Sequence, residues 1–143
     1  MNGAVTWLGV AMAGGLGAVA RFLVDLGVSH LLTGPTRPAT EATTDGTVPQ
    51  RPSRPRLGTI IVNVTGSLLA GMVAGSAIAG HLGVEVETVV AGGFLGAYTT
   101  FSTAMFQAVT VFEERRPMAA TANLVSTLVL AVAAAWCGVI ITT

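Results

Sequence analysis

The chain has 143 residues and a formal net charge of zero, with 52% apolar residues and only 10% charged residues. Soluble domains typically carry about a quarter charged residues, so this composition argues against a soluble domain and indicates a protein of the lipid bilayer. Cys137 is the only cysteine, which excludes a disulfide framework and a cysteine-based metal site.

Four stretches with few or no charged residues are long enough to cross the bilayer, whose hydrocarbon core of about 30 Å needs roughly 20 helical residues. The predicted spans cover about 4–28, 57–80, 88–112 and 117–141. Backbone groups in lipid must be paired within the protein, and the alternation typical of a barrel strand is absent, so the spans should be helices. We therefore predict one all-α membrane domain over residues 1–143.

The first span contains Arg21 and Asp25, the ionisable residues that lie within a predicted span. They are four residues apart near the end of the span. Either they have a structural role, as an ion pair or as side chains that reach the membrane interface, or they have a functional role. A signal peptide is disfavoured because residues 1–20 contain no Lys or Arg. The lack of any other carboxylate in the spans argues against a proton-coupled or cation-coupled exporter.

The connection over residues 33–56 holds five of the six prolines together with Thr, Gly and charged residues. This composition predicts a solvated, largely irregular linker between the first two spans. The other connections are short, and Pro117 suits the first turn of the fourth helix.

Neutral polar side chains recur at helical spacing in the second and fourth spans. Thr59, Asn63 and Ser67 are four residues apart, as are Asn123 and Thr127, so each set forms a polar stripe along one helix face. Such residues can join helices by hydrogen bonds. Their amide and hydroxyl donors can also replace the hydration shell of a small anion, and both interpretations remain open.

The third span is the most unusual, because three glycines between positions 92 and 96 are followed by a run rich in hydroxyl residues. This sequence predicts a break near the middle of the helix, where freed carbonyls could bind a cation. Phe101 adds an aromatic ring whose electropositive edge can meet an anion. Glycines at 71 and 75, at 92 and 96, and at 14, 15 and 17 predict close helix packing.

The arginines are placed on one side of the predicted topology, and the chain has no lysine. Arg37, Arg51, Arg54, Arg56, Arg115 and Arg116 all lie in the connections after the first and third spans. The positive-inside rule predicts that these connections are cytoplasmic and that both termini lie outside. The chain should therefore insert in one orientation.

Three motifs resemble those of the Fluc/CrcB fluoride channels. They are residues 14–22 (GGLGAVARF), 58–67 (GTIIVNVTGS) and 93–103 (GFLGAYTTFST), and with Asn123 the resemblance extends over all four spans. It implies an antiparallel dimer in the cell membrane with fluoride pores, which exports fluoride passively and lowers its cytoplasmic concentration. No catalytic residue is expected, so the protein is not predicted to be an enzyme.

The resemblance also implies roles for individual residues. Gly96 and Thr99 match the positions whose backbone carbonyls hold a structural, untransported sodium ion, and Arg21 matches the family's arginine. Asn63, Phe101, Asn123 and Thr127 match pore positions. With the neighbouring polar residues, the predicted pore-lining set is Asn63, Phe101, Thr59, Ser102, Thr103, Asn123 and Thr127.

Two positions depart from the family pattern, which continues with a second Phe and then a Glu where this chain has Ala104 and Gln107. A homodimer would therefore have incomplete pores, and the arginine bias opposes antiparallel insertion of one sequence. These departures favour a heterodimer with an oppositely inserted paralogue over an antiparallel homodimer. The alternatives are a small four-helix multidrug or cation exporter and a non-conducting supporting subunit of the channel.

Overall fold

The computed structural model describes residues 3–33 and 57–143, and within these ranges every regular element is a helix. Four helices are long and apolar enough to span a membrane: Gly3–Val28, Leu57–Ile78, Val84–Glu113 and Pro117–Thr142. The predicted four-helix, all-α membrane fold is confirmed. Most of the predicted linker, with Arg37, Arg51, Arg54 and Arg56, lies outside the described residues.

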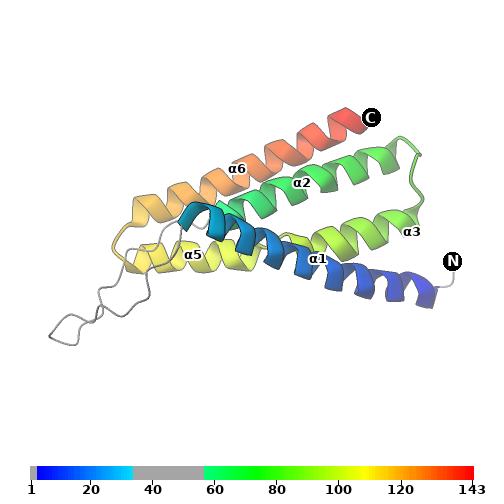
Figure 1. Cartoon of the computed structure of the whole chain (residues 1–143). Coiled ribbons are helices and arrows are strands. Elements are labelled where there is room, and N and C mark those ends of the chain that lie inside the picture. Colours follow the sequence, from blue (N-terminus) through cyan, green and yellow to red (C-terminus); the bar gives the residue numbers. More distant parts are fainter. Residues whose placement is uncertain (1–2, 34–56) are drawn as a thin grey trace.

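Three of the four spans are single helices: α1 (Gly3–Thr33), α2 (Leu57–Ile78) and α6 (Pro117–Thr142). The third span consists of α3 (Val84–Glu87), the π-helix η1 (Thr88–Leu95), α4 (Gly96–Tyr98) and α5 (Phe101–Glu113). The predicted break in the third helix is therefore confirmed, and it falls between α4 and α5 (Figure 1).

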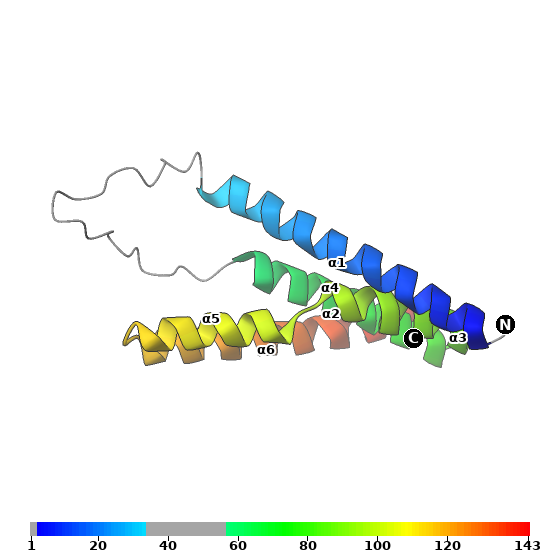
Figure 2. The same ribbon diagram turned by 90° about the horizontal axis from the view of Figure 1, so that it is seen from below.

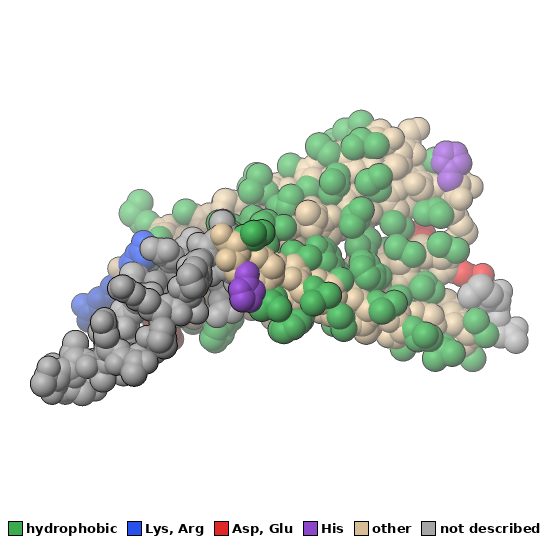
Figure 3. Space-filling model, viewed as in Figure 1, with side chains coloured by type: hydrophobic (Ala, Val, Ile, Leu, Met, Phe, Trp, Pro, Cys, Tyr) green, Lys and Arg blue, Asp and Glu red, His purple; other side chains and the backbone are tan. Residues whose placement is uncertain are grey.

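The helices form an elongated bundle whose two ends are chemically different. One end of the bundle holds the start of α1, the end of α6 and the turn before α3. At the other end, α5 is followed by α6 (Figures 1 and 2). Between the two ends, apolar side chains are spread over the face shown in Figure 3. The charged side chains visible on this face lie toward the ends. This distribution suits a bundle that crosses a bilayer.

Glycines set the closest contact in the bundle, the one between α2 and α6. Gly71 packs against the backbone of Ala135, and Gly138 packs in turn against the backbone of Leu68. A Cβ at either position would collide with these backbone atoms, which cannot give way as a flexible side chain can. The predicted packing role of Gly71 is confirmed, and Gly75 likewise contacts Val139.

The contact between α1 and the third span differs from the predicted glycine pair. Gly93 packs against Val10, and Gly17 packs against the Phe94 carbonyl, whereas the space beside Gly92 is open and Gly96 meets only the Ala91 carbonyl of its own span. The prediction assumed α-helical periodicity. The π-helical turns of η1 contain more residues each, so a different glycine faces α1.

Candidate functional site

The break in the third span consists of two consecutive extended residues. Thr99 has φ −77° and ψ 159°, and Thr100 has φ −150° and ψ 118°. Both pairs of angles lie in the β region, so the helical hydrogen-bond ladder stops here. It resumes when α5 begins at Phe101.

Asn63 of α2 pairs with the backbone of Thr100 through both ends of its side-chain amide. Its Oδ1 accepts a hydrogen bond from the Thr100 N–H at 2.8 Å, and its Nδ2 donates to the Thr100 carbonyl at 2.9 Å. Asn63 and Thr100 are both buried. The Asn63 amide thus pairs with the extended Thr100 backbone through one accepted and one donated hydrogen bond, as a neighbouring β-strand would.

The hydroxyl of Thr100 caps the helix that follows the break. Its Oγ1 accepts a hydrogen bond from the Thr103 N–H at 3.2 Å, and the Thr100 and Thr103 hydroxyls are 3.0 Å apart. An N-cap threonine pairs one of the backbone donors that a helix start leaves open. Ser102 Oγ lies 3.3 Å from the same hydroxyl.

These pairings leave two specific carbonyls without their helical donors. In a continuous helix the N–H of Thr100 would donate to Gly96, and that of Thr103 would donate to Thr99. Here the first donates to Asn63 and the second to the Thr100 hydroxyl. Gly96 and Thr99, the two residues predicted to bind sodium, therefore have carbonyls available for another partner.

A second set of contacts holds the residues before the break. The Tyr98 hydroxyl lies 3.1 Å from Thr65 Oγ1 of α2, and the Tyr98 ring stacks on Phe94 at a centroid distance of 6.0 Å. Gly66 lies against both Tyr98 and Thr99, where a Cβ would have no room. Helix α2 therefore holds the break on both of its sides.

A cavity of about 190 Å³ opens beside the break, between α2, α5 and α6. Its lining combines predicted pore residues, other polar residues of the break and apolar side chains: Asn63, Ser67, Thr99, Thr100, Phe101, Ala104, Leu124, Thr127, Leu128 and Ala131. Asn63, Phe101 and Thr127 of the predicted pore set are brought together here. Among the described residues that line it, none carries a carboxylate or a cationic side chain.

A second cavity, of about 270 Å³, lies on the α1 side of the same break. It is lined by Arg21, Phe22, Asp25, Thr59, Val62, Thr100 and Thr103. Thr100 borders both cavities. Thr59 accepts a hydrogen bond from Gln107 Nε2 at 2.7 Å, so Gln107 fixes a polar side chain of this cavity.

Two predicted pore residues do not line either cavity. Asn123 lies one turn before Thr127 on α6, and its backbone carbonyl accepts the Thr127 hydroxyl at 2.7 Å. Ser102 is exposed beside Phe101, whose side chain is 70% exposed. The pore roles of Ser102 and Asn123 remain predictions, as do those of the other predicted pore residues.

Thr100 is the residue of this site that the sequence interpretation did not single out. It is one of four buried polar side chains among the described residues, together with Thr59, Asn63 and Thr127. Its position immediately before a new helix is typical of an N-cap. That signal is present in the sequence, but it identifies a cap only once the start of α5 is known.

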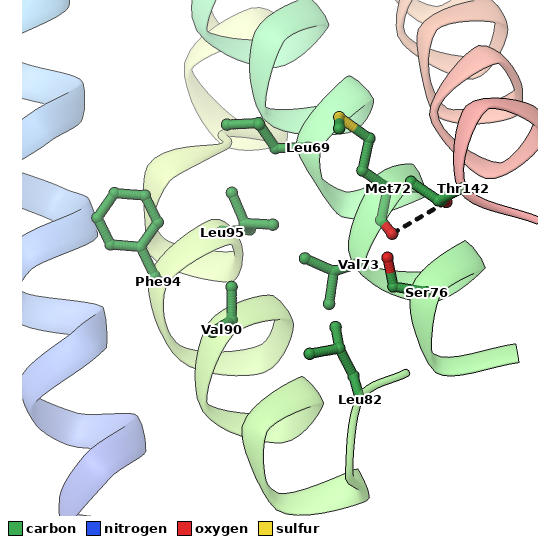
Figure 4. A pocket seen from close by; sticks show the side chains of 9 residues that line it. All are labelled: Leu69, Met72, Val73, Ser76, Leu82, Val90, Phe94, Leu95 and Thr142. Carbon is green, nitrogen blue, oxygen red and sulfur yellow. Dashed lines mark hydrogen bonds between the residues drawn. The ribbon is translucent and has the colours of Figure 1, made fainter. Parts of the chain in front are cut away.

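The cavity in Figure 4 is of a different kind, although it is larger, at about 330 Å³. Apolar side chains of α2, η1 and the turn before α3 line it, with Ser76 and Thr142 as the polar exceptions. The Thr142 hydroxyl donates to the Met72 carbonyl at 3.2 Å (Figure 4). Its lining suits hydrocarbon, whereas more polar side chains line the two cavities at the break.

Known proteins match this chain over most of its length. A family model described as "CrcB-like protein, Camphor Resistance (CrcB)" matches residues 8–139. The chain is 40% identical over 139 residues to a protein of Mycolicibacterium paratuberculosis named "Fluoride-specific ion channel FluC 2", with 96% of this chain and 94% of the relative covered. It is 38% identical to "Fluoride-specific ion channel FluC 1" of Leifsonia xyli, covering 92% of this chain and 82% of the relative. It is 36% identical to "Fluoride-specific ion channel FluC 3" of Bifidobacterium longum, with 92% and 93% covered.

Proposed function

The chain belongs to the CrcB family, and from this premise we propose that it is a subunit of a fluoride-specific ion channel in the cell membrane. Its transport is passive and lowers the fluoride concentration of the cytoplasm. The observation that carries the proposal is the broken third helix, beside a cavity that Asn63, Thr100 and Phe101 help to line, in a chain that matches fluoride channels over nearly its whole length.

The cavity at the break supplies the donors that a small anion needs. Asn63 uses one N–H on the Thr100 carbonyl, which leaves a second N–H of the same amide for an anion. Phe101 borders the same space. Neutral donors and a ring edge replace hydration without a fixed negative charge, which would repel fluoride.

The exposure of the break supports assembly with a second subunit. Gly96 and Phe101 are exposed, and they lie near the middle of a helix that spans the membrane. Lipid cannot satisfy backbone groups that lack a partner, so irregular backbone at this depth must be buried in protein or must line a polar space. We therefore propose a dimer in which the second subunit covers the break.

We further propose that the break holds a structural sodium ion. The carbonyls of Gly96 and Thr99 have lost their helical donors to Asn63 and Thr100, and hard cations prefer such oxygen ligands. A dimer would bring two sets of these carbonyls to one site. When bound, the ion supplies positive charge next to an anion path and compensates the unpaired carbonyls.

The identity of the second subunit is also a proposal. The Arg-bearing connections are placed in the cytoplasm and both termini outside by the positive-inside rule. This bias, together with Ala104 at the second phenylalanine position, favours an oppositely inserted paralogue as the partner. Relatives that carry the numbered names FluC 1, FluC 2 and FluC 3 fit the existence of such paralogues.

Fluoride efflux from liposomes tests these proposals. We expect little efflux from the chain alone and robust, fluoride-selective efflux when it is reconstituted with its paralogue. Robust efflux without a partner would contradict the obligate heterodimer, and efflux that does not distinguish fluoride from chloride would contradict fluoride specificity.

A supporting, non-conducting role is the second candidate, because Ala104 is buried and borders the cavity where a phenylalanine would stand. Substitution of Phe101 in this chain separates the two roles. Loss of flux with normal assembly favours a pore role, whereas unchanged flux favours the supporting role.

A further inference from the structure

We propose that Asn63 is a positioning residue that keeps the third span open at Thr99 and Thr100. In this way it creates the cation site as well as bordering the anion path. The inference rests on the proposed channel and its sodium site, and it assigns to one α2 side chain the geometry on which both depend.

The first step is the competition for a single hydrogen bond. The Thr100 N–H can donate either to the Gly96 carbonyl, which continues the helix, or to Asn63 Oδ1, which opens it. The structure has the second arrangement, at 2.8 Å. The Nδ2 bond to the Thr100 carbonyl at 2.9 Å adds a second hydrogen bond that holds Thr100 in this arrangement.

The second step is the cost of removing that side chain. Without Asn63, the buried Thr100 N–H would lose its acceptor on α2, and an unpaired buried backbone group costs about 1–3 kcal/mol. The cheapest way to recover this bond is to close the helix, with Thr100 donating to Gly96. Closure would occupy the carbonyls that a cation needs.

The third step separates this role from ordinary lining of the cavity. Thr127 borders the same space, but its hydroxyl donates to the Asn123 carbonyl on its own helix, whereas Asn63 bonds the Thr100 backbone. Thr127→Val is therefore a matched control. It removes a polar group from the cavity and leaves the hydrogen bonds at the break unchanged.

Thermal stability of the purified full chain, with its paralogue where assembly requires it, measures the cation site without measuring transport. The melting temperature is compared in sodium chloride and in N-methylglucamine chloride. We expect sodium to raise it by several degrees in the wild type and in Thr127→Val, and to have no effect in Asn63→Leu. No sodium effect in the wild type, or an undiminished effect in Asn63→Leu, would overturn the proposal.

A rescue variant tests whether the open helix is what Asn63 provides. Proline is well suited to the first position of α5, because that N–H has no helical acceptor and the preceding Thr100 is already extended. Phe101→Pro should keep the break open, so the double variant Asn63→Leu with Phe101→Pro should regain the sodium effect. Failure to regain it would overturn the positioning role.

If the Asn63→Leu chain does not assemble, the double variant still tests the proposal, because its proline keeps the third span open. Fluoride efflux is measured in parallel and is expected to be lost in both Asn63 variants. Absence of efflux from the wild-type chain reconstituted with its paralogue would contradict the proposed channel, yet sodium-dependent melting would still decide the role of Asn63.

Discussion

The side chain of Asn63 and the backbone of Thr100 form a pair of hydrogen bonds, 2.8 and 2.9 Å long, between α2 and the broken third span. This pair joins residues 37 positions apart in the sequence. It holds the third helix open at Thr100, and Thr100 borders both cavities at the break.

Thr100→Val should destabilise the protein by about 0.5–2 kcal/mol, because α5 loses its capping oxygen and Thr103 loses its partner. Thermal denaturation in detergent measures the change. Thr110→Val is the matched control, since the Thr110 hydroxyl donates to the Phe106 carbonyl on its own helix. Equal effects from the two substitutions would argue against a special role for the cap.

Gly66→Ala should destabilise the chain by about 1–3 kcal/mol, because a Cβ there has no room beside Tyr98 and Thr99. The same measurement on Gly27→Ala provides the comparison. Gly27 has open space around it on α1, so alanine there should be neutral or slightly stabilising. A harmless Gly66→Ala would show that α2 does not need to lie so close to the break.

Gln107 and Thr59 should be energetically coupled through their 2.7 Å hydrogen bond. We expect a coupling energy of about 1 kcal/mol in a double-mutant cycle of Gln107→Leu and Thr59→Val, measured by unfolding. Additive effects would mean that the bond contributes nothing to stability. Fluoride efflux of the same variants would then show whether Thr59 acts independently of Gln107.

The orientation prediction can be checked with single cysteines in a Cys137→Ser background. A cysteine in place of Thr143 should react with a membrane-impermeant maleimide in intact cells, because the termini are predicted to be outside. Met118→Cys, at an 86% exposed position at the opposite end of α6, should react only after permeabilisation. Labelling of both cysteines in intact cells would show dual insertion and would reopen the homodimer.

Ala104→Phe should be tolerated, because Ala104 borders a cavity of about 190 Å³. In the assembled channel we expect a severalfold increase in fluoride efflux if the second phenylalanine completes a pore. Ala104→Leu fills the same space without an aromatic ring and should give no increase. An equal gain from both substitutions would contradict a specific role for the ring edge.

The sequence by itself determined the membrane class, the four spans and the region of the break. The apolar runs, the glycine and hydroxyl content of residues 92–103 and the spacing of Thr59, Asn63 and Ser67 are local signals, each read within a single span. Family resemblance added the identity of the ion.

Only the tertiary structure decided which partners these residues take. Asn63 was predicted as an anion donor, and its pairing with the Thr100 backbone depends on how α2 packs against the third span. The π-helical turns of η1 likewise changed which glycine faces α1. A hydrogen bond between distant residues depends on the relative placement of two helices, and no periodicity within either helix contains that information.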